Sequence, residues 1–119
     1  MKKFFLVVLL SASFAGCAGN APPNLTPANQ VLYTNTQRIQ ALDILRDSAI
    51  DANSKMLLST DTTRRVVQGH EDILKLINAQ SSGWMIQAKI IASGILVQLP
   101  KAESDILTPL VNSVLASLQ

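Results

Sequence analysis

The sequence predicts an all-α fold, a small bundle of three or four helices on a short N-terminal tether. Three observations lead to this prediction. Apolar residues after residue 26 recur at spacings of three and four, which is the period of an α-helix. Ser, Thr, Gly and Pro residues separate these apolar segments at positions typical of helix ends. No segment shows the alternation of apolar and polar residues that marks a strand.

The first two helices are predicted from their starts and their apolar stripes. Thr26 followed by Pro27 is a typical helix start, because the hydroxyl can accept from a free amide and proline suits the first helical position. This helix is expected to end near Asn53, and a loop over 54–60 leads to a second helix over 62–79. The residues of the two stripes are Leu32, Ile39, Leu42, Leu45 and Ala49, then Val66, His70, Ile73, Leu74 and Ile77.

The third predicted helix, 84–99, follows a break at Ser81-Ser82-Gly83 and is apolar on nearly all sides. Such a helix is typical of a bundle centre or of a membrane span. We expect the bundle centre, because the segment is only about sixteen residues long and contains Gln87, Lys89 and Gln98.

Pro100 separates this segment from a fourth predicted helix over 101–118, where Pro109 either kinks the helix or restarts it. The apolar face of this last helix consists of Ile106, Leu107, Leu110, Val111, Val114, Leu115 and Leu118.

The N-terminal residues have the pattern of a secretory signal peptide. Lys2 and Lys3 supply positive charge, an apolar run of about ten residues follows, and small residues lead to Cys17, the only cysteine. The apolar run is too short to cross a bilayer as an ordinary helix, which needs about twenty residues. Simple cleavage after Ala15 and an uncleaved anchor are two interpretations of this pattern.

A third interpretation comes from Phe14-Ala15-Gly16-Cys17, which resembles the lipobox of bacterial lipoproteins, although the family prefers Leu where Phe14 stands. The resemblance implies that residues 1–16 are a signal peptide and that Cys17 is lipidated and becomes the first mature residue. Residues 17–25, with their two prolines, would then be a semi-rigid tether, and residues 26–119 the helical domain.

The resemblance also implies where the protein lies. In this family an aspartate after the cysteine often retains the protein in the inner membrane, and here that residue is Ala18. We therefore expect attachment to the outer membrane, on its periplasmic side. Two or more acyl chains hold a protein stably on a bilayer, so a membrane is the first expected partner.

The charge balance excludes one class of partner. Without Lys2 and Lys3, eight basic residues face eight acidic ones, and the mature chain has no net charge. We expect no nucleic-acid partner, because phosphate-driven binding needs a basic field. With Cys17 carrying lipid, no disulfide can form, so stability must come from helix packing or from a homo-oligomer.

Catalytic and metal-binding candidates are few. His70 could be a general base or a metal ligand, but no second histidine follows four residues later, and its neighbours Glu71 and Asp72 do not share its helix face. We expect His70 to be a packed, hydrogen-bonded core residue. The carboxylates at positions 43, 47 and 51 are expected on a solvated face, and Ser81-Ser82 lack a base. No catalytic, cofactor-binding or metal-binding residue is predicted.

Three residues are candidates for interaction with a partner. Arg64 and Arg65 lie early in the second helix, where the macrodipole disfavours cations, so they could contact anionic headgroups. A solvated pair is the simpler interpretation. Trp84, the only tryptophan, is expected either to fill the core or to be an interaction hot spot.

The function expected from these features is that of a small, non-enzymatic envelope lipoprotein, an adaptor that meets a protein partner at the membrane surface. One alternative is a membrane-active, lysis- or toxin-like lipoprotein whose third helix perturbs the bilayer. A phage-encoded envelope protein would show the same sequence features. A small hydrolase is a further alternative with little support, because candidate bases and metal ligands are so few.

Overall fold

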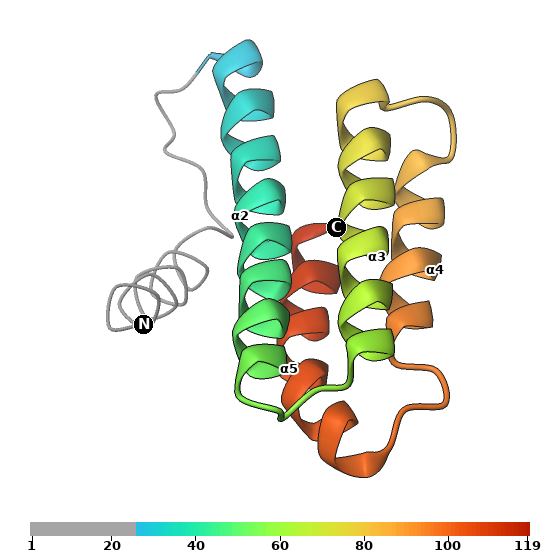
Figure 1. Cartoon of the computed structure of the whole chain (residues 1–119). Coiled ribbons are helices and arrows are strands. Elements are labelled where there is room, and N and C mark those ends of the chain that lie inside the picture. Colours follow the sequence, from blue (N-terminus) through green and yellow to red (C-terminus); the bar gives the residue numbers. More distant parts are fainter. Residues whose placement is uncertain (1–25) are drawn as a thin grey trace.

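The computed structural model describes residues 26–119, which form four helices and no strand (Figure 1). They are α2 (Pro27–Ser54), α3 (Thr60–Ala79), α4 (Trp84–Ile95) and α5 (Lys101–Ser117). The predicted all-α bundle is confirmed. The four helices form a closed ring, because α3 packs against α2 and α4, and α5 packs against the same two helices. The first and last of these helices are therefore neighbours.

The helix ends follow from side chains that the sequence places there. Thr26 Oγ1 accepts a hydrogen bond from the amide of Asn29 at 3.2 Å, and Ser59 Oγ accepts one from the amide of Thr62 at 3.1 Å. Each hydroxyl satisfies one of the free amides of a first helical turn. Gln80 ends α3 in the left-handed conformation, with φ of 47°. These caps fix the two long helices near their expected bounds.

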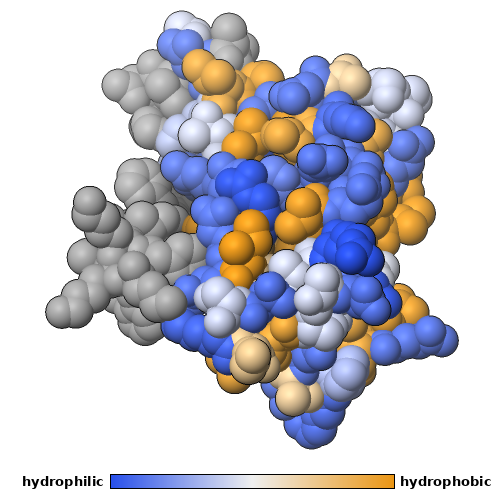
Figure 2. All heavy atoms as spheres, viewed as in Figure 1, coloured by the Kyte–Doolittle hydropathy of each residue, from blue (hydrophilic) through white to orange (hydrophobic). Residues whose placement is uncertain are grey.

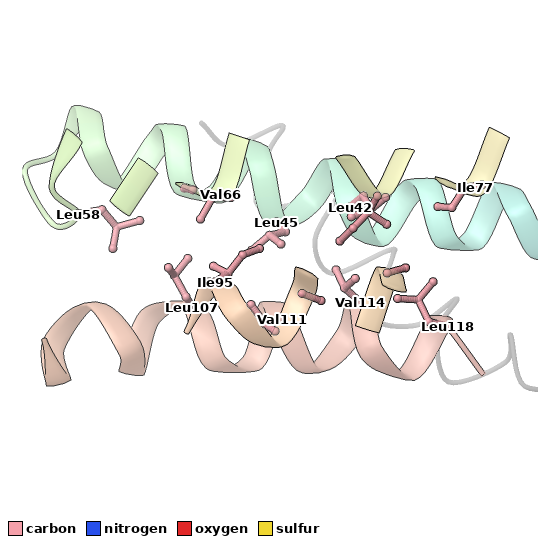
Figure 3. Close-up of a cluster of buried hydrophobic side chains, with 14 of the residues drawn as sticks. Leu42, Leu45, Leu58, Val66, Ile77, Ile95, Leu107, Val111, Val114 and Leu118 are labelled. Carbon is pink, nitrogen blue, oxygen red and sulfur yellow. The ribbon is translucent and has the colours of Figure 1, made fainter. Parts of the chain in front are cut away.

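The core lies along the axis of the ring and receives side chains from all four helices (Figure 3). The predicted stripes of α2, α3 and α5 supply most of it. Leu32 and Leu74 are the exceptions, because Leu32 is 65% exposed and Leu74 is half-buried outside the core cluster. Figure 1 gives the reason for Leu32, since the N-terminal part of α2 extends beyond the C-terminal end of α5. The largest of the fully buried side chains are Leu42, Leu45, Val66, Ile73, Ile95, Leu107, Val111, Val114 and Leu118.

The prediction that the third helix lies at the bundle centre is wrong. Helix α4 has 12 residues and ends at Ile95, and residues 96–98 form a turn. Ile86 and Ile90 are 68% and 66% exposed, whereas the residues that α4 buries are Ala88, Ala92 and Ile95. Helix α4 is one side of the ring, packed mainly against α3 and α5, so its small residues face inward and its outer isoleucines face solvent.

Gly69 on α3 lets α4 approach closely. A Cβ at this position would lie 2.9 Å from Ile95 Cδ1 and 3.3 Å from Ile95 Cγ1. Real Cβ atoms essentially never come within 3.0 Å of another heavy atom. The side chain of Ile95 therefore occupies the space that any larger residue at position 69 would need.

Helix α5 continues through Pro109, so of the two alternatives expected at this proline, a kink or a restart, the restart does not occur. Proline lacks an amide hydrogen and removes one bond from the helix ladder. Thr108, the residue before Pro109, adds a local hydrogen bond, because its Oγ1 donates to the carbonyl oxygen of Ser104 at 2.6 Å. Pro109 is exposed, while Leu107 and Val111 on either side of it are buried, so its ring lies on the outer face of the helix.

Candidate functional site

Cys17, the predicted lipidation site, lies outside the described residues, and its lipidation stays a prediction. The same is true of the predicted signal peptide, residues 1–16, and of the whole predicted tether, residues 17–25. The other predicted site residues, Arg64, Arg65 and Trp84, all lie within the bundle. They do not form one cluster, because each has different partners.

Trp84 begins α4, is half-buried and packs against the hydrophobic core. Its ring is covered by Arg38 of α2, whose guanidinium carbon lies 5.0 Å from the ring centroid. This geometry is a cation–π contact. Trp84 therefore contributes to packing, as one of its two interpretations expected, and Arg38 is a partner that the sequence did not indicate.

Arg38 is an unusual core residue, because it is only 8% exposed. Its Nε donates to the carbonyl oxygen of Ser117 at 3.1 Å, and its Nη1 donates to Asn35 Oδ1 at 2.9 Å. Burial lowers the pKa of Arg38 from its ordinary value. The carbonyl at the end of α5 carries partial negative charge, so Arg38 sits where the helix dipole favours a cation. Arg38 thus joins α2, α4 and α5.

Arg64 and Arg65 have different environments despite being adjacent. Arg64 forms an exposed ion pair with Asp61, with 3.3 Å between Nη1 and Oδ1. Arg65 reaches across to the end of α4, where its Nη1 donates to the carbonyl oxygens of Ile95 and Val97 at 3.3 and 2.6 Å. The charge of Arg65 lies near the start of α3, where the helix dipole disfavours a cation. It also lies at the C-terminal end of α4, where the dipole favours one. A structural role as a cap accounts for Arg65 without headgroup contact.

The two arginines border an open groove of about 510 Å³ between α3 and α4. Gly69, Ile91, Gly94 and Ile95 supply its apolar part, and both acidic and basic side chains stand at its edges. Opposite charges close together leave the groove without a preference for an ion of one sign. The remaining lining residues are Asp61, Arg64, Arg65, Gln68 and Asp72.

His70 is 3% exposed and hydrogen-bonded, so the prediction of a packed core histidine is confirmed. Its Nε2 lies 2.8 Å from Asp43 Oδ1 and 3.4 Å from Arg46 Nη1. A carboxylate only accepts hydrogen bonds, so the short contact places the imidazole proton on Nε2. The Asp43 side chain is 44% exposed, as expected for a solvated face, and it also accepts this hydrogen bond from the buried His70. Asp43 and His70 are 27 residues apart, and no local pattern links them.

The other two acidic residues of that face behave as expected. Asp47 pairs with Arg46 at 3.0 Å, and Asp51 pairs with Lys55 at 3.1 Å, all on the partly exposed side of α2. Within residues 26–119, no group of three or more His, Cys, Asp or Glu residues is arranged to hold a metal ion. None of the helices in this range combines the length and apolar character that crossing a bilayer requires.

The most distinctive surface is the outer side of α4 and of the turn that follows it. Ile86, Ile90 and Val97 are all more than half exposed, and we call them the α4 outer face. Ile86 and Ile90 are four residues apart and share one side of the helix. In Figure 2 apolar residues reach the surface on the side where α4 lies in Figure 1. No protein-family model, curated protein or solved structure matches the chain.

Proposed function

We propose that this protein is a non-enzymatic, lipid-anchored adaptor of the bacterial envelope, held on the outer membrane through Cys17. Its helical domain would bind a protein partner at the periplasmic surface. The α4 outer face is the observation that carries this proposal. Ile86 and Ile90 on one side of α4 and Val97 in the turn after it remain largely in water, whereas Ala88, Ala92 and Ile95 of the same helix are buried in the core.

The chemistry of this face suits a helical partner. Ile86 and Ile90 are one turn apart, which is the spacing by which apolar helix faces are recognised. Burying one such side chain completely contributes about 1.5–3 kcal/mol, so this small face would give a weak interface by itself. Confinement to the same membrane raises the effective concentration of the two proteins, and a weak interface then suffices.

The anchor is tested by metabolic labelling. Labelled palmitate should enter the wild-type chain and not Cys17→Ser, because the thiol sulfur is the atom that carries the lipid. The wild-type protein should also fractionate with outer membranes, and Cys17→Ser should be released. Equal labelling of both proteins would contradict the anchor.

The docking surface is tested by photocrosslinking in intact cells. A photoreactive residue at Ile90 should give a discrete protein adduct, and the same residue at Asn112, exposed on α5, is the matched control. The Ile90 adduct should disappear when Ile86→Asp is added, because the charge would have to be desolvated in the interface. Identical adducts from both positions, or an adduct insensitive to Ile86→Asp, would contradict docking at this face.

The membrane-active alternative makes a different prediction for the same residues. If the α4 outer face acts on lipid, the purified lipoprotein should release dye from vesicles, and Ile86→Asp should abolish the leakage. An adaptor should leave the vesicles intact. Leakage that depends on Ile86 would replace the adaptor proposal.

A further inference from the structure

A second exposed apolar group lies at the N-terminal end of α2. Val31 and Leu32 are 55% and 65% exposed. Val31 continues the buried face of α2 at alternating spacings of four and three, a series that runs through Asn35, Arg38 and Leu42. The face is buried from Arg38 onward but exposed at Val31, because α2 extends beyond the end of α5 (Figure 1). Two neighbouring apolar side chains are thus left uncovered at the start of α2 within the described residues.

The start of α2 carries no charged side chain. Between Lys3 and Arg38 the sequence contains no Asp, Glu, Lys, Arg or His, and Arg38 itself is buried. The other exposed large apolar residues of α2 and its loop have charged neighbours in the sequence, since Ile50 precedes Asp51 and Met56 and Leu57 follow Lys55. Ionised side chains are the most costly to bring into a bilayer, so the start of α2 is the part of this helix that a lipid surface tolerates best.

The polar side chains in these turns are partly satisfied within the helix. Thr34 Oγ1 donates to the carbonyl oxygen of Gln30 at 2.9 Å, and Thr36 Oγ1 donates to that of Leu32 at 2.8 Å. A hydroxyl whose proton is already bonded to backbone loses less when water is removed. Tyr33 lies among them, and tyrosine is a residue type favoured at membrane interfaces.

The position of the predicted anchor points to the occupant of this surface. Thr26, the first described residue, is nine residues after Cys17. Nine residues span at most about 30 Å even when fully extended, so a lipid on Cys17 keeps the start of α2 close to the bilayer. We propose that the N-terminal turns of α2, residues 26–36, rest on the phospholipid surface. The bundle then stands with the loop between α2 and α3 directed away from the membrane.

This inference rests on the anchor of the proposed function and assigns an orientation to it. The helices of the bundle run roughly side by side in Figure 1, so an upright bundle also holds α4 upright, with the start of α4 toward the bilayer and its outer side parallel to the bilayer normal. The α4 outer face is then directed sideways, where it can meet another envelope protein. Contact of α4 with the bilayer would require a different orientation.

The test uses the full lipoprotein with single introduced thiols. Because the sulfur of Cys17 carries lipid, Leu32→Cys, Met56→Cys and Ile90→Cys each offer one free thiol for a polarity-sensitive dye. All three positions are exposed, and Met56, at 93%, lies in the turn at the far end of α2. Each labelled protein is reconstituted into vesicles of phosphatidylethanolamine and phosphatidylglycerol that contain headgroup-proximal spin-labelled lipid.

We expect the dye at position 32 to be quenched severalfold more than the dyes at positions 56 and 90, and to be the least accessible to aqueous iodide. Equal quenching at 32 and 56 would overturn the upright orientation. Stronger quenching at 90 than at 32 would also overturn it and would place α4 on the lipid. Circular dichroism of each variant confirms that the bundle is intact.

Palmitate labelling of the same samples separates the two proposals. If Cys17 carries palmitate and position 32 is not quenched, the orientation is wrong and the anchor stands. If Cys17 carries no palmitate, the parent chain itself reacts with the dye, and the anchor and the orientation fall together. A final variant, Leu32→Asp, should move Val31→Cys out of the quenched layer, because the charge must stay hydrated, while palmitate incorporation stays unchanged.

Discussion

The guanidinium of Arg65 donates from Nη1 to the carbonyl oxygen of Val97 across 2.6 Å, and so joins the start of α3 to the end of α4. The macrodipole of α3 disfavours a cation near the start of that helix, where Arg65 lies. The contact with the end of α4 explains why a cation is found there. The last carbonyls of a helix have no partner within that helix and carry partial negative charge. Arg65 satisfies them from a neighbouring helix, which stabilises the shortest element of the bundle.

Arg65→Ala should lower the free energy of unfolding by about 1–2 kcal/mol, because two carbonyls lose a charged donor. Arg64→Ala is the matched control and should change stability by about 0.5 kcal/mol or less, since its ion pair with Asp61 is exposed. Urea unfolding followed by circular dichroism measures both variants. Equal losses of stability in Arg65→Ala and Arg64→Ala would mean that the contact of Arg65 with α4 contributes no more than an exposed ion pair.

Asp43→Ala should destabilise the bundle by about 1–3 kcal/mol, because it leaves the buried Nε2 of His70 without its acceptor. Asp43→Asn keeps an oxygen that can accept and should recover part of that loss. Asp47→Ala, whose partner is the partly exposed Arg46, should cost about 1 kcal/mol or less. Thermal melts of the three proteins give the comparison, and an Asp43→Ala variant as stable as Asp47→Ala would contradict the role of the pair.

Arg38 and Trp84 should be energetically coupled. A double-mutant cycle with Arg38→Met and Trp84→Leu should give a coupling of about 0.5–2 kcal/mol, as expected for a partly desolvated cation–π contact. Trp84 is the only tryptophan, so its fluorescence should also change in Arg38→Met. As a control, Arg38→Met combined with Leu57→Ser, at an exposed loop position, should be additive within about 0.5 kcal/mol.

The two glycines on the facing helices α3 and α4 should respond in opposite directions to alanine. Gly94→Ala meets no atom within 4 Å and should stabilise the protein by about 0.5–1 kcal/mol through helix propensity. Gly69→Ala gains the same propensity but clashes with buried Ile95, and overpacking of this kind costs about 1–3 kcal/mol.

Ile95→Val removes Cδ1, the atom that a Cβ at position 69 would meet first. It should therefore partly rescue Gly69→Ala. The double variant should lose less stability than the sum of the losses in the two single variants. Differential scanning calorimetry measures the four proteins. A Gly69→Ala variant stabilised as much as Gly94→Ala would show that Ile95 moves without cost.

The bundle was predictable because its signals are local. Thr26 and Ser59 cap the long helices, Pro100 precedes the last one, and the stripes of α2, α3 and α5 have the helical period. The orientation of α4 was not predictable in this way. Its apolar residues lie on nearly all sides, so periodicity could not show that Ala88 and Ala92, rather than Ile86 and Ile90, face the core.

The polar contacts were the least predictable part of the candidate sites. Asp43 with His70 and Arg38 with Trp84 each join residues from different helices, and only the packing of those helices brings them together. The exposure of Leu32 has a similar cause, because it depends on where α5 ends rather than on the sequence of α2. The sequence singled out Arg64 and Arg65 as candidates for interaction, but it did not indicate their different partners within the bundle.

The contact between α2 and α5 determines when this chain can fold. Leu42 and Leu45 meet Leu107, Val111 and Val114 in one core, so the hydrophobic interior is incomplete until the last helix has been made. A ribosome releases the N-terminal residues long before that point, and a nascent chain without α5 would keep an uncovered apolar surface. Delayed closure of this kind leaves α2 and α3 without a complete core until the end of synthesis.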